Sequence, residues 1–247
     1  PMFKKELVEW LTDQSESYIL EKCGTNFREL LMTPAYKKAP ENKNILIYDE
    51  YPNVCSIMYD SEKNVVFLVL VNQNGQIVDA KSFYFLTTPL ELQPRMVNQN
   101  NNAFDAQFGG AANVPQLTQP NLSQCEFYNE SNGESEFSLL KKMISEKFQP
   151  DIFVISANHI KSKIIKDNIT FLLKDIHPNI QIPVVYGNCN VPYIFMMTPT
   201  LHSGLENYNS FIKQAASLAR YKQNPLGEIL NLWTEDTNTN KCLSLNL

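Results

Sequence analysis

The sequence predicts an α/β fold in which a mixed β-sheet is flanked by helices. Two observations support this prediction. Short apolar runs rich in β-forming residues dominate residues 44–83, which is typical of strands joined by tight turns. From residue 134 onward helical patterns alternate with short apolar runs, which favours parallel strands joined by right-handed crossover helices. With 247 residues, the chain is long enough to bury a sizeable core.

The composition indicates a soluble protein and excludes several other classes. Hydrophobic residues make up 43% of the chain and charged residues 19%, as in ordinary globular domains. The net charge of −5 argues against a broad nucleic-acid-binding face, which needs clustered Lys and Arg. The longest apolar run, Val65–Val71, is far too short to cross a bilayer. Five widely spaced cysteines form no zinc-type cluster, and without an N-terminal signal segment they fit a reducing compartment.

Residues 1–43 are predicted to be a helical lead-in to a domain that spans residues 44–247. Phe3–Met32 has a helical pattern, with Leu7, Leu11 and Tyr18 roughly on one face. Gly24 is a candidate break point, which would leave residues 26–32 as a second, short helix. Because the chain begins with a proline rather than an initiator Met, we expect a piece of a longer protein.

The region 44–83 contains the clearest strand signals. Asn44–Tyr48 is a short run of β-formers, and Val54–Tyr59 either extends this strand or opens the next. Val65–Val71 is apolar on both faces, as expected of a central strand that is covered on both sides. Asn74-Gly75 is a strong hairpin signal that joins it to Gln76–Phe83, so these two strands are predicted to be antiparallel.

Residues 85–133 are predicted to form a low-complexity insertion. The segment combines Asn, Gln, Gly and Pro with few charges and no sustained hydrophobic period. Such a segment lacks the apolar surface needed to offset the entropy of ordering, so disorder is expected. A self-associating segment is the alternative interpretation.

The second half of the domain is predicted to alternate between helices and strands. The predicted elements are a helix at Glu134–Phe148, a strand at Asp151–Ser156, a helix at Ile160–Ile176, a buried strand at Ile182–Tyr186 and a helix at Val191–Met197. Pro183 places the last strand at a start or an edge. Cys242–Leu247 alternates like an edge strand or a tail. Together with the leading antiparallel strands, this order predicts a ribonuclease H-like mixed sheet.

Phe211–Trp233 is predicted to form two packed helices separated by a proline. The first carries an apolar stripe, with the polar residues mostly off it; the stripe is Phe211, Ile212, Ala215, Leu218 and Ala219, and the polar residues are Lys213, Gln214, Arg220 and Lys222. Pro225 ends this helix and can occupy the first turn of the second, which spans Leu226–Leu232. The apolar positions of the second helix are Leu226, Ile229, Leu230 and Trp233.

A ribonuclease H-like sheet supports two-metal hydrolysis when carboxylates converge at the strand ends. Asp49 is a candidate for the acid on the first strand. The strand at Asp151–Ser156 runs into Ala157, Asn158 and His159, and the strand at Ile182–Tyr186 runs into Asn188, Cys189 and Asn190, with no carboxylate in either case. One lone Asp with neutral amides would hold Mg²⁺ weakly. The sequence therefore predicts a non-catalytic domain with no catalytic, metal or cofactor-binding residues.

Three other functions compete with this prediction. A metal-dependent nuclease or resolvase on the same fold is the main alternative. Nucleic-acid binding without cleavage is another. A catalytic pair of His159 and Cys189, near adjacent strand ends, is also conceivable, although histidines at element ends are usually caps. The common phosphate-binding, zinc-protease and serine-hydrolase motifs are absent from the sequence.

The residues AASLARYKQNPLGEI at Ala215–Ile229 resemble the segment that ends the YqgF, ribonuclease H-like domain of the Suppressor-of-Ty family. Members of this family are nuclear transcription elongation factors and histone chaperones, the eukaryotic relatives of bacterial Tex. Ala216 replaces a common Val, and Asn224 stands where Asp is usual. The hairpin FLVLVNQNGQIVDAKSF at Phe67–Phe83 is also similar to that of the family.

The resemblance implies a nuclear protein that travels with RNA polymerase II, handles histones and maintains chromatin behind the enzyme. It also implies an inert nuclease fold that acts as a scaffold. The implied partners are other domains of the same large protein, with histones and the polymerase machinery contacted through the full-length protein. Direct nucleic-acid binding by this domain is expected to be weak or absent.

Overall fold

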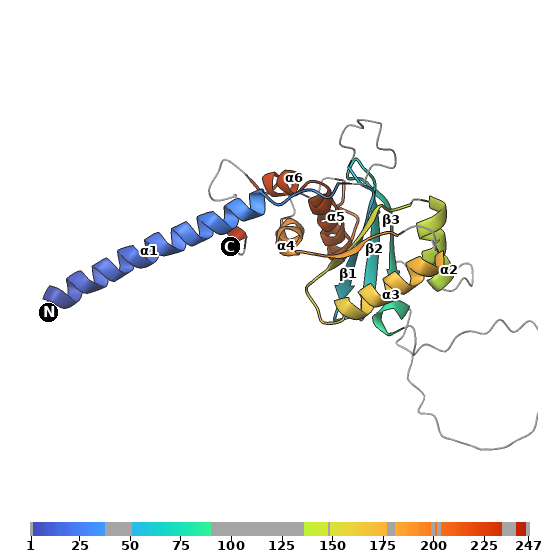
Figure 1. The fold of residues 1–247 in the computed structure, drawn as a ribbon, viewed down its shortest axis with the longest axis horizontal. Coiled ribbons are helices and arrows are strands. Elements are labelled where there is room, and N and C mark those ends of the chain that lie inside the picture. Colours follow the sequence, from blue (N-terminus) through green and yellow to red (C-terminus); the bar gives the residue numbers. More distant parts are fainter. Residues whose placement is uncertain are drawn as a thin grey trace, which may run out of the picture.

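A five-stranded mixed sheet with the strand order β3-β2-β1-β4-β5 forms the centre of the computed structural model (Figure 1). The structure describes residues 2–37, 51–89, 136–147, 149–176, 181–198, 201, 204–233 and 241–245. The strands are β1 (Val54–Asp60), β2 (Val65–Val71), β3 (Ile77–Phe83), β4 (Ile152–Ser156) and β5 (Val184–Gly187). β1, β2 and β3 pair antiparallel, whereas β1 pairs parallel with β4 and β4 with β5. The predicted α/β fold with a ribonuclease H-like mixed sheet is confirmed.

The β2–β3 hairpin forms where the sequence predicts it. Gly75 has a φ of +75°, a left-handed conformation that residues with a Cβ rarely adopt, and its N–H donates to the Asn72 carbonyl at 2.9 Å. Every residue of β2 is buried, as predicted for a central strand covered on both faces. The apolar strand and the glycine turn together set the register of the antiparallel half of the sheet.

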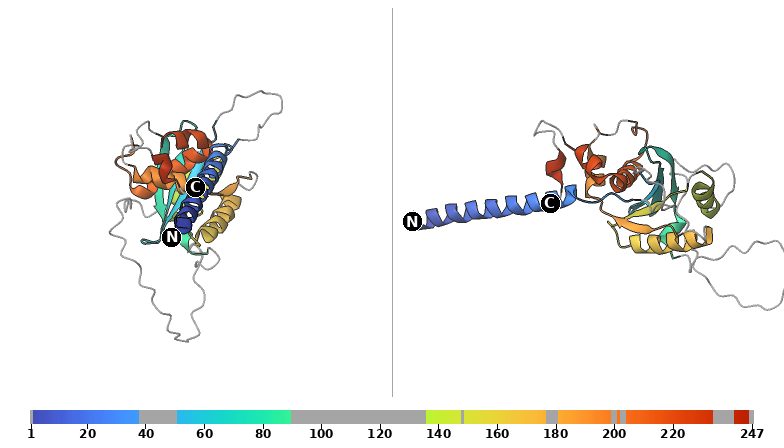
Figure 2. Two further views of the ribbon diagram at one scale, coloured as in Figure 1. Left: turned by 90° about the vertical axis from the view of Figure 1, so that its left-hand side faces the viewer. Right: turned by 45° about the horizontal axis from the view of Figure 1, so that its top comes forward.

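Helices cover both faces of this sheet (Figures 1 and 2). They are α2 (Glu136–Lys142) with a π-helical extension at Met143–Lys147, α3 (Ser162–Ile176), α4 (Asn190–Met197), α5 (Ser210–Gln223) and α6 (Pro225–Leu230). Alternate residues of a strand point to opposite faces. Ile57 and Phe153 therefore pack with α3 on one face, whereas Met58 packs with Leu218 of α5 on the other. Leu218 is fully buried, as the apolar stripe of its helix predicts.

A single helix, α1 (Met2–Leu31), extends away from the sheet (Figures 1 and 2). Only its last turns pack on the domain, where Phe27, Leu30 and Leu31 contact a cluster that includes Tyr221 and Ile229. No helix in the described part of the chain is both long and apolar enough to span a membrane.

The predicted break of this helix at Gly24 is wrong. The helix continues through Gly24, and the residues expected to form a second helix are its last turns. One internal glycine costs only about 1 kcal/mol relative to alanine, which is too little to end a helix without proline or a competing cap.

The predicted insertion begins too early. Phe85–Thr87 forms a 3₁₀ turn (η1), and Leu86 is fully buried in the core on the α3 side of the sheet. Asn168 of α3 fixes this turn, because its side-chain amide donates to the Leu86 carbonyl at 3.0 Å and to the Thr88 carbonyl at 2.8 Å. The remainder of the predicted insertion, and the predicted strand Asn44–Tyr48, lie outside the described residues.

Three further expectations change in the structure. β5 is half-buried rather than buried, because it is the edge strand of the sheet. Lys241–Ser244 forms a 3₁₀ turn (η6) instead of an edge strand, and Cys242 and Leu245, three residues apart, enter the same cluster as Ile229.

Of the apolar positions predicted for the second helix, only Ile229 is buried, together with Leu232, whereas Leu226, Leu230 and Trp233 are exposed. A helix of six residues has fewer than two turns, so it can bury only a few side chains on a single face.

Candidate functional site

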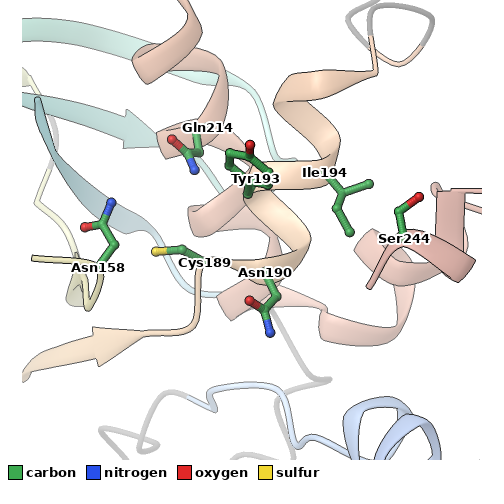
Figure 3. Close-up of a pocket in the computed structure, with 7 residues that line it drawn as sticks. All are labelled: Asn158, Cys189, Asn190, Tyr193, Ile194, Gln214 and Ser244. Atoms are coloured by element: carbon green, nitrogen blue, oxygen red, sulfur yellow. The ribbon is translucent and has the colours of Figure 1, made fainter. Parts of the chain in front are cut away.

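A partly open pocket of about 370 Å³ lies at the carboxyl ends of β4 and β5 (Figure 3). It is lined by Asn158, Cys189, Asn190, Tyr193, Ile194, Gln214 and Ser244. In open α/β sheets, ligands commonly bind outside the carboxyl ends of parallel strands. The pocket is therefore the candidate functional site of this domain.

Parallel strand pairing brings the first lining residues together. Asn158 follows β4 by two residues, and Cys189 follows β5 by two residues. Since Ser156 of β4 pairs with Gly187 of β5 in a parallel register, both chain segments leave the sheet at the same edge. Cys189 is the N-cap of α4, so this helix begins at the pocket.

Two helices complete the wall. Asn190, Tyr193 and Ile194 are at positions i, i+3 and i+4 of α4 and share one of its faces. Gln214 is in the second turn of α5. The other end of α5 lies at the opposite edge of the sheet, where the Gln223 amide donates to the carbonyl of Pro52 just before β1. The first turns of α5 are thereby placed at the pocket edge.

The side chain of Gln214 is buried but makes no hydrogen bond within the described part of the chain. Its exposed fraction is 6%, and its amide reaches the pocket. The side-chain amide of Asn158, which is exposed, is likewise unpaired among the described residues. In Figure 3, Asn158, Cys189 and Gln214 turn toward a common space. These groups supply hydrogen-bond donors and acceptors without formal charge.

The Cys189 thiol is not activated as a nucleophile. Burial raises its pKa above the ordinary value of 9.0, and a hydrogen bond with the Ala157 backbone opposes this shift only in part. The sulfur lies 3.7 Å from the Gly187 carbonyl, to which the thiol donates a weak hydrogen bond. Because the thiolate is the reactive form, this thiol contributes a neutral group at neutral pH.

The structure does not bring His159 and Cys189 together. The His159 ring lies against Tyr59, with ring centroids 4.8 Å apart, and its Nδ1 accepts a hydrogen bond from the Lys161 N–H at 3.1 Å. Tyr59 belongs to the core on the α3 side of the sheet, whereas Cys189 packs on the α5 side. His159 thus acts as a cap for the following turn, and the catalytic pair considered from the sequence is wrong.

Two carboxylates that lie at ends of described strands, or next to them, accept hydrogen bonds from backbone amides, and neither is among the described lining residues of the pocket. Asp60, at the end of β1, accepts hydrogen bonds from the N–H groups of Glu62 and Lys63 at 2.9 and 3.2 Å. Asp151 precedes β4 and accepts from the Asn53 N–H at 2.8 Å, at the opposite edge of the sheet. Asp49, the candidate metal ligand, lies outside the described residues. Within the described ranges, no three His, Cys, Asp or Glu residues cluster as a metal site would require.

The sequence prediction missed four of the described lining residues, which are Tyr193, Ile194, Gln214 and Ser244. Gln214 was placed mostly off the apolar stripe of its helix, yet it lies three residues after Phe211 and four before Leu218, both of which pack on the sheet. This spacing is the signal that could have identified it. Tyr193 carries no comparable signal, because its exposure depends on how α4 is rotated against the domain.

Comparison with known proteins assigns no family to this fold and pocket. The resemblance of Ala215–Ile229 to the YqgF domain accordingly stays a prediction. No protein-family model matches the chain, and no curated protein matches its sequence.

Proposed function

We propose that this chain is a non-catalytic ribonuclease H-like domain that acts as a scaffold within a nuclear histone chaperone and transcription elongation factor. In this proposal, the full-length protein works with RNA polymerase II on chromatin, and the domain holds neighbouring domains of the same protein in place. The observation that carries the non-catalytic part is the chemistry of the pocket at the carboxyl ends of β4 and β5 (the strand-end pocket). Its described lining consists of amides, hydroxyl groups, a protonated thiol and one aliphatic side chain.

Neutral residues at the strand ends favour a scaffold over a nuclease. Two-metal hydrolysis needs several carboxylates that converge on a pair of Mg²⁺ ions. Asp60, the carboxylate at the end of the described strand β1, is 3% exposed and already accepts two backbone hydrogen bonds. Amide carbonyls from Asn158 and Gln214 would bring no charge, so Asp49 by itself would hold the metal weakly.

The assignment to the chaperone family is supported by the structural roles of the matching residues. Within Ala215–Ile229, Gln223 donates to the carbonyls of Pro52 and Asn72 at 2.7 and 2.8 Å. The Asn224 side chain accepts from the Gly227 N–H at 3.0 Å and so caps α6. Residues that carry the resemblance thus build the corner between α5 and α6.

A nuclease assay tests the catalytic part of the proposal. The purified chain is incubated with branched DNA, single-stranded DNA and RNA in Mg²⁺ or Mn²⁺, and we expect no cleavage. The variant Asp49→Asn removes the candidate metal ligand, and Glu62→Gln, at an exposed position, is the matched control. Cleavage that Asp49→Asn abolishes and Glu62→Gln retains would establish the nuclease alternative instead.

A cellular experiment tests the chromatin part. The chromosomal copy is tagged, and the full-length protein is located and purified from nuclease-treated extract. We expect nuclear localisation and co-purification with RNA polymerase II and core histones. A cytoplasmic protein that co-purifies with neither would refute the assignment to the family while leaving the result of the nuclease assay intact.

A further inference from the structure

The strand-end pocket contains a buried amide whose hydrogen bonds are not made by the described protein. Gln214 has two donors and an acceptor in its side chain and is 6% exposed, yet it makes no hydrogen bond to a described residue. Polar groups in native proteins are almost always paired with protein, water or ligand, and the Gln214 amide can be reached through the pocket. Because the amide lines the pocket, a group that enters the pocket can pair with it.

The described lining of the pocket offers no charged partner to a ligand. Among the described residues, no Asp, Glu, Lys, Arg or His lines it. A charged group that leaves water needs an opposite charge or several strong hydrogen bonds in compensation, and here only neutral partners face it. The volume of about 370 Å³ lies near the lower end of the range for small-molecule sites, so a single ring system fits better than a folded segment.

Aromatic surface completes the site. Tyr193 is 53% exposed and lies one helical turn after Asn190, so part of its ring faces the open side of the pocket. An exposed tyrosine offers a flat face on which a planar ring can stack. Ile194, which is 7% exposed, adds an apolar wall from the same helix. A planar heteroaromatic ring with hydrogen-bonding edges matches this combination.

We propose that this pocket binds a neutral adenine base. A carboxamide presents one donor beside one acceptor and pairs in bidentate fashion with the exocyclic amine and a ring nitrogen of adenine. Gln214 supplies that amide from a buried position, exposed Asn158 supplies a second, and Tyr193 stacks on the ring. Guanine presents two acceptors on the equivalent edge and is recognised best by arginine, which is absent from the described lining residues.

The adenine has two potential sources, a free nucleoside or a base of a single strand. The binding chemistry is the same in both, and it does not depend on the proposed role in chromatin. The two sources differ in charge, because a strand brings phosphates whose binding weakens steeply with salt. Adenosine and a short oligoadenylate therefore distinguish them when both are titrated at low and high salt.

Titration of the full chain with adenosine and guanosine, followed by NMR chemical shifts, tests the proposal. We expect low-millimolar or tighter binding of adenosine, with shift changes centred on Asn158, Tyr193 and Gln214. Guanosine should bind at least about fivefold more weakly, the lower limit for the loss of one bidentate pair. Equal binding of both nucleosides, or no shift change with low-millimolar adenosine, would overturn the proposal.

Two pairs of variants assign the binding to the named groups. Gln214→Leu removes the amide at similar volume and should weaken adenosine binding at least about fivefold, whereas Gln181→Leu, at an exposed site before β5, should not. Tyr193→Ala should weaken binding to a similar extent, whereas Tyr193→Phe should retain it, because the ring rather than the hydroxyl stacks. Tyr193 is exposed, so its variants remain informative even if Gln214→Leu fails to fold. Unchanged affinity in Tyr193→Ala contradicts the proposal.

Discussion

The side-chain amide of Gln223 donates a hydrogen bond to the carbonyl of Asn72 at 2.8 Å. The same amide nitrogen donates to the Pro52 carbonyl at 2.7 Å, and Gln223 is only 4% exposed. Asn72 follows β2 and Pro52 precedes β1, so one side chain at the end of α5 ties that helix to two neighbouring strands. This contact orients α5 along the sheet and thereby places Gln214, more than two turns earlier, at the opposite edge.

Replacement of this amide is expected to destabilise the domain. Gln223→Leu should lower the free energy of unfolding by about 1–3 kcal/mol, because it leaves two partly buried carbonyls without their donor. Urea denaturation measures the change, and Gln181→Leu, at an exposed position, serves as the matched control with little expected effect. Equal midpoints for the two variants would show that the Gln223 contacts do not stabilise the fold.

The close approach of Leu218 to Gly187 should appear as an energetic coupling. A Cβ added at Gly187 would lie 2.7 Å from both Leu218 Cδ1 and Val154 Cγ1. Gly187→Ala is expected to destabilise the domain by about 1–3 kcal/mol through overpacking, and Leu218→Ala by about 2–5 kcal/mol through a cavity.

In the double variant the alanine methyl gains the space that Leu218 vacates, so the combined loss should be smaller than the sum of the two single losses. Denaturant unfolding of the two single variants and the double variant measures this coupling. Strict additivity would indicate that the two residues do not touch in solution.

Gly24 weakens α1 without ending it, so alanine should strengthen the helix. Gly24→Ala is expected to stabilise α1 by about 0.5–1 kcal/mol, since a new Cβ meets no atom within 4 Å. Slower amide hydrogen exchange around residue 24 measures this gain. Gly24→Pro should have the opposite effect and speed exchange in the preceding turn, because proline cannot continue the hydrogen-bond ladder. Unchanged exchange in both variants would mean that α1 is not helical at this position.

Glu228 is expected to make stability depend on pH. Its carboxyl is 3% exposed and accepts a hydrogen bond from the Asn231 side-chain amide at 2.9 Å. Burial raises the pKa of Glu228 above its ordinary value of 4.5, although Asn231, the positive charge of Arg220 and the nearby Ser217 hydroxyl oppose the shift. The folded state therefore holds this proton more tightly than the unfolded state.

Because the pKa of Glu228 is higher in the folded state than in the unfolded state, its contribution to stability is complete below pH 4.5. The contribution is lost as pH rises through the folded-state pKa. Glu228→Gln keeps an acceptor for Asn231 but cannot ionise, so it should melt at a higher temperature than the unmodified protein at pH 7. The difference should shrink toward pH 4. Thermal unfolding across this range is the measurement, with Glu62→Gln at an exposed site as control. If the difference in melting temperature between Glu228→Gln and the unmodified protein widens on acidification, the pKa of Glu228 is not raised by folding.

Much of the fold could be predicted from local sequence patterns. Val65–Val71 and the Asn74-Gly75 turn carry their own conformational preference, and the structure has both where they were expected. The Pro225 break was also confirmed, because proline acts on the backbone whatever its surroundings. The 3₁₀ turns at Phe85–Thr87 and Lys241–Ser244 were missed, because their buried residues are fixed by contacts with α3 and α6 rather than by a local period.

The sequence by itself determined which residues follow the parallel strands, and hence that Asn158 and Cys189 lie at one edge of the sheet without a neighbouring carboxylate. Only the tertiary structure decided that Gln214 faces a pocket there, with an amide that no described residue pairs, and that His159 turns away from Cys189. The order and direction of the strands decide which strand ends share an edge of the sheet, and hydrophobic patterns in the sequence reveal both. Side-chain surroundings depend on how α4 and α5 are rotated against the sheet, and that rotation is set by packing between residues distant in sequence.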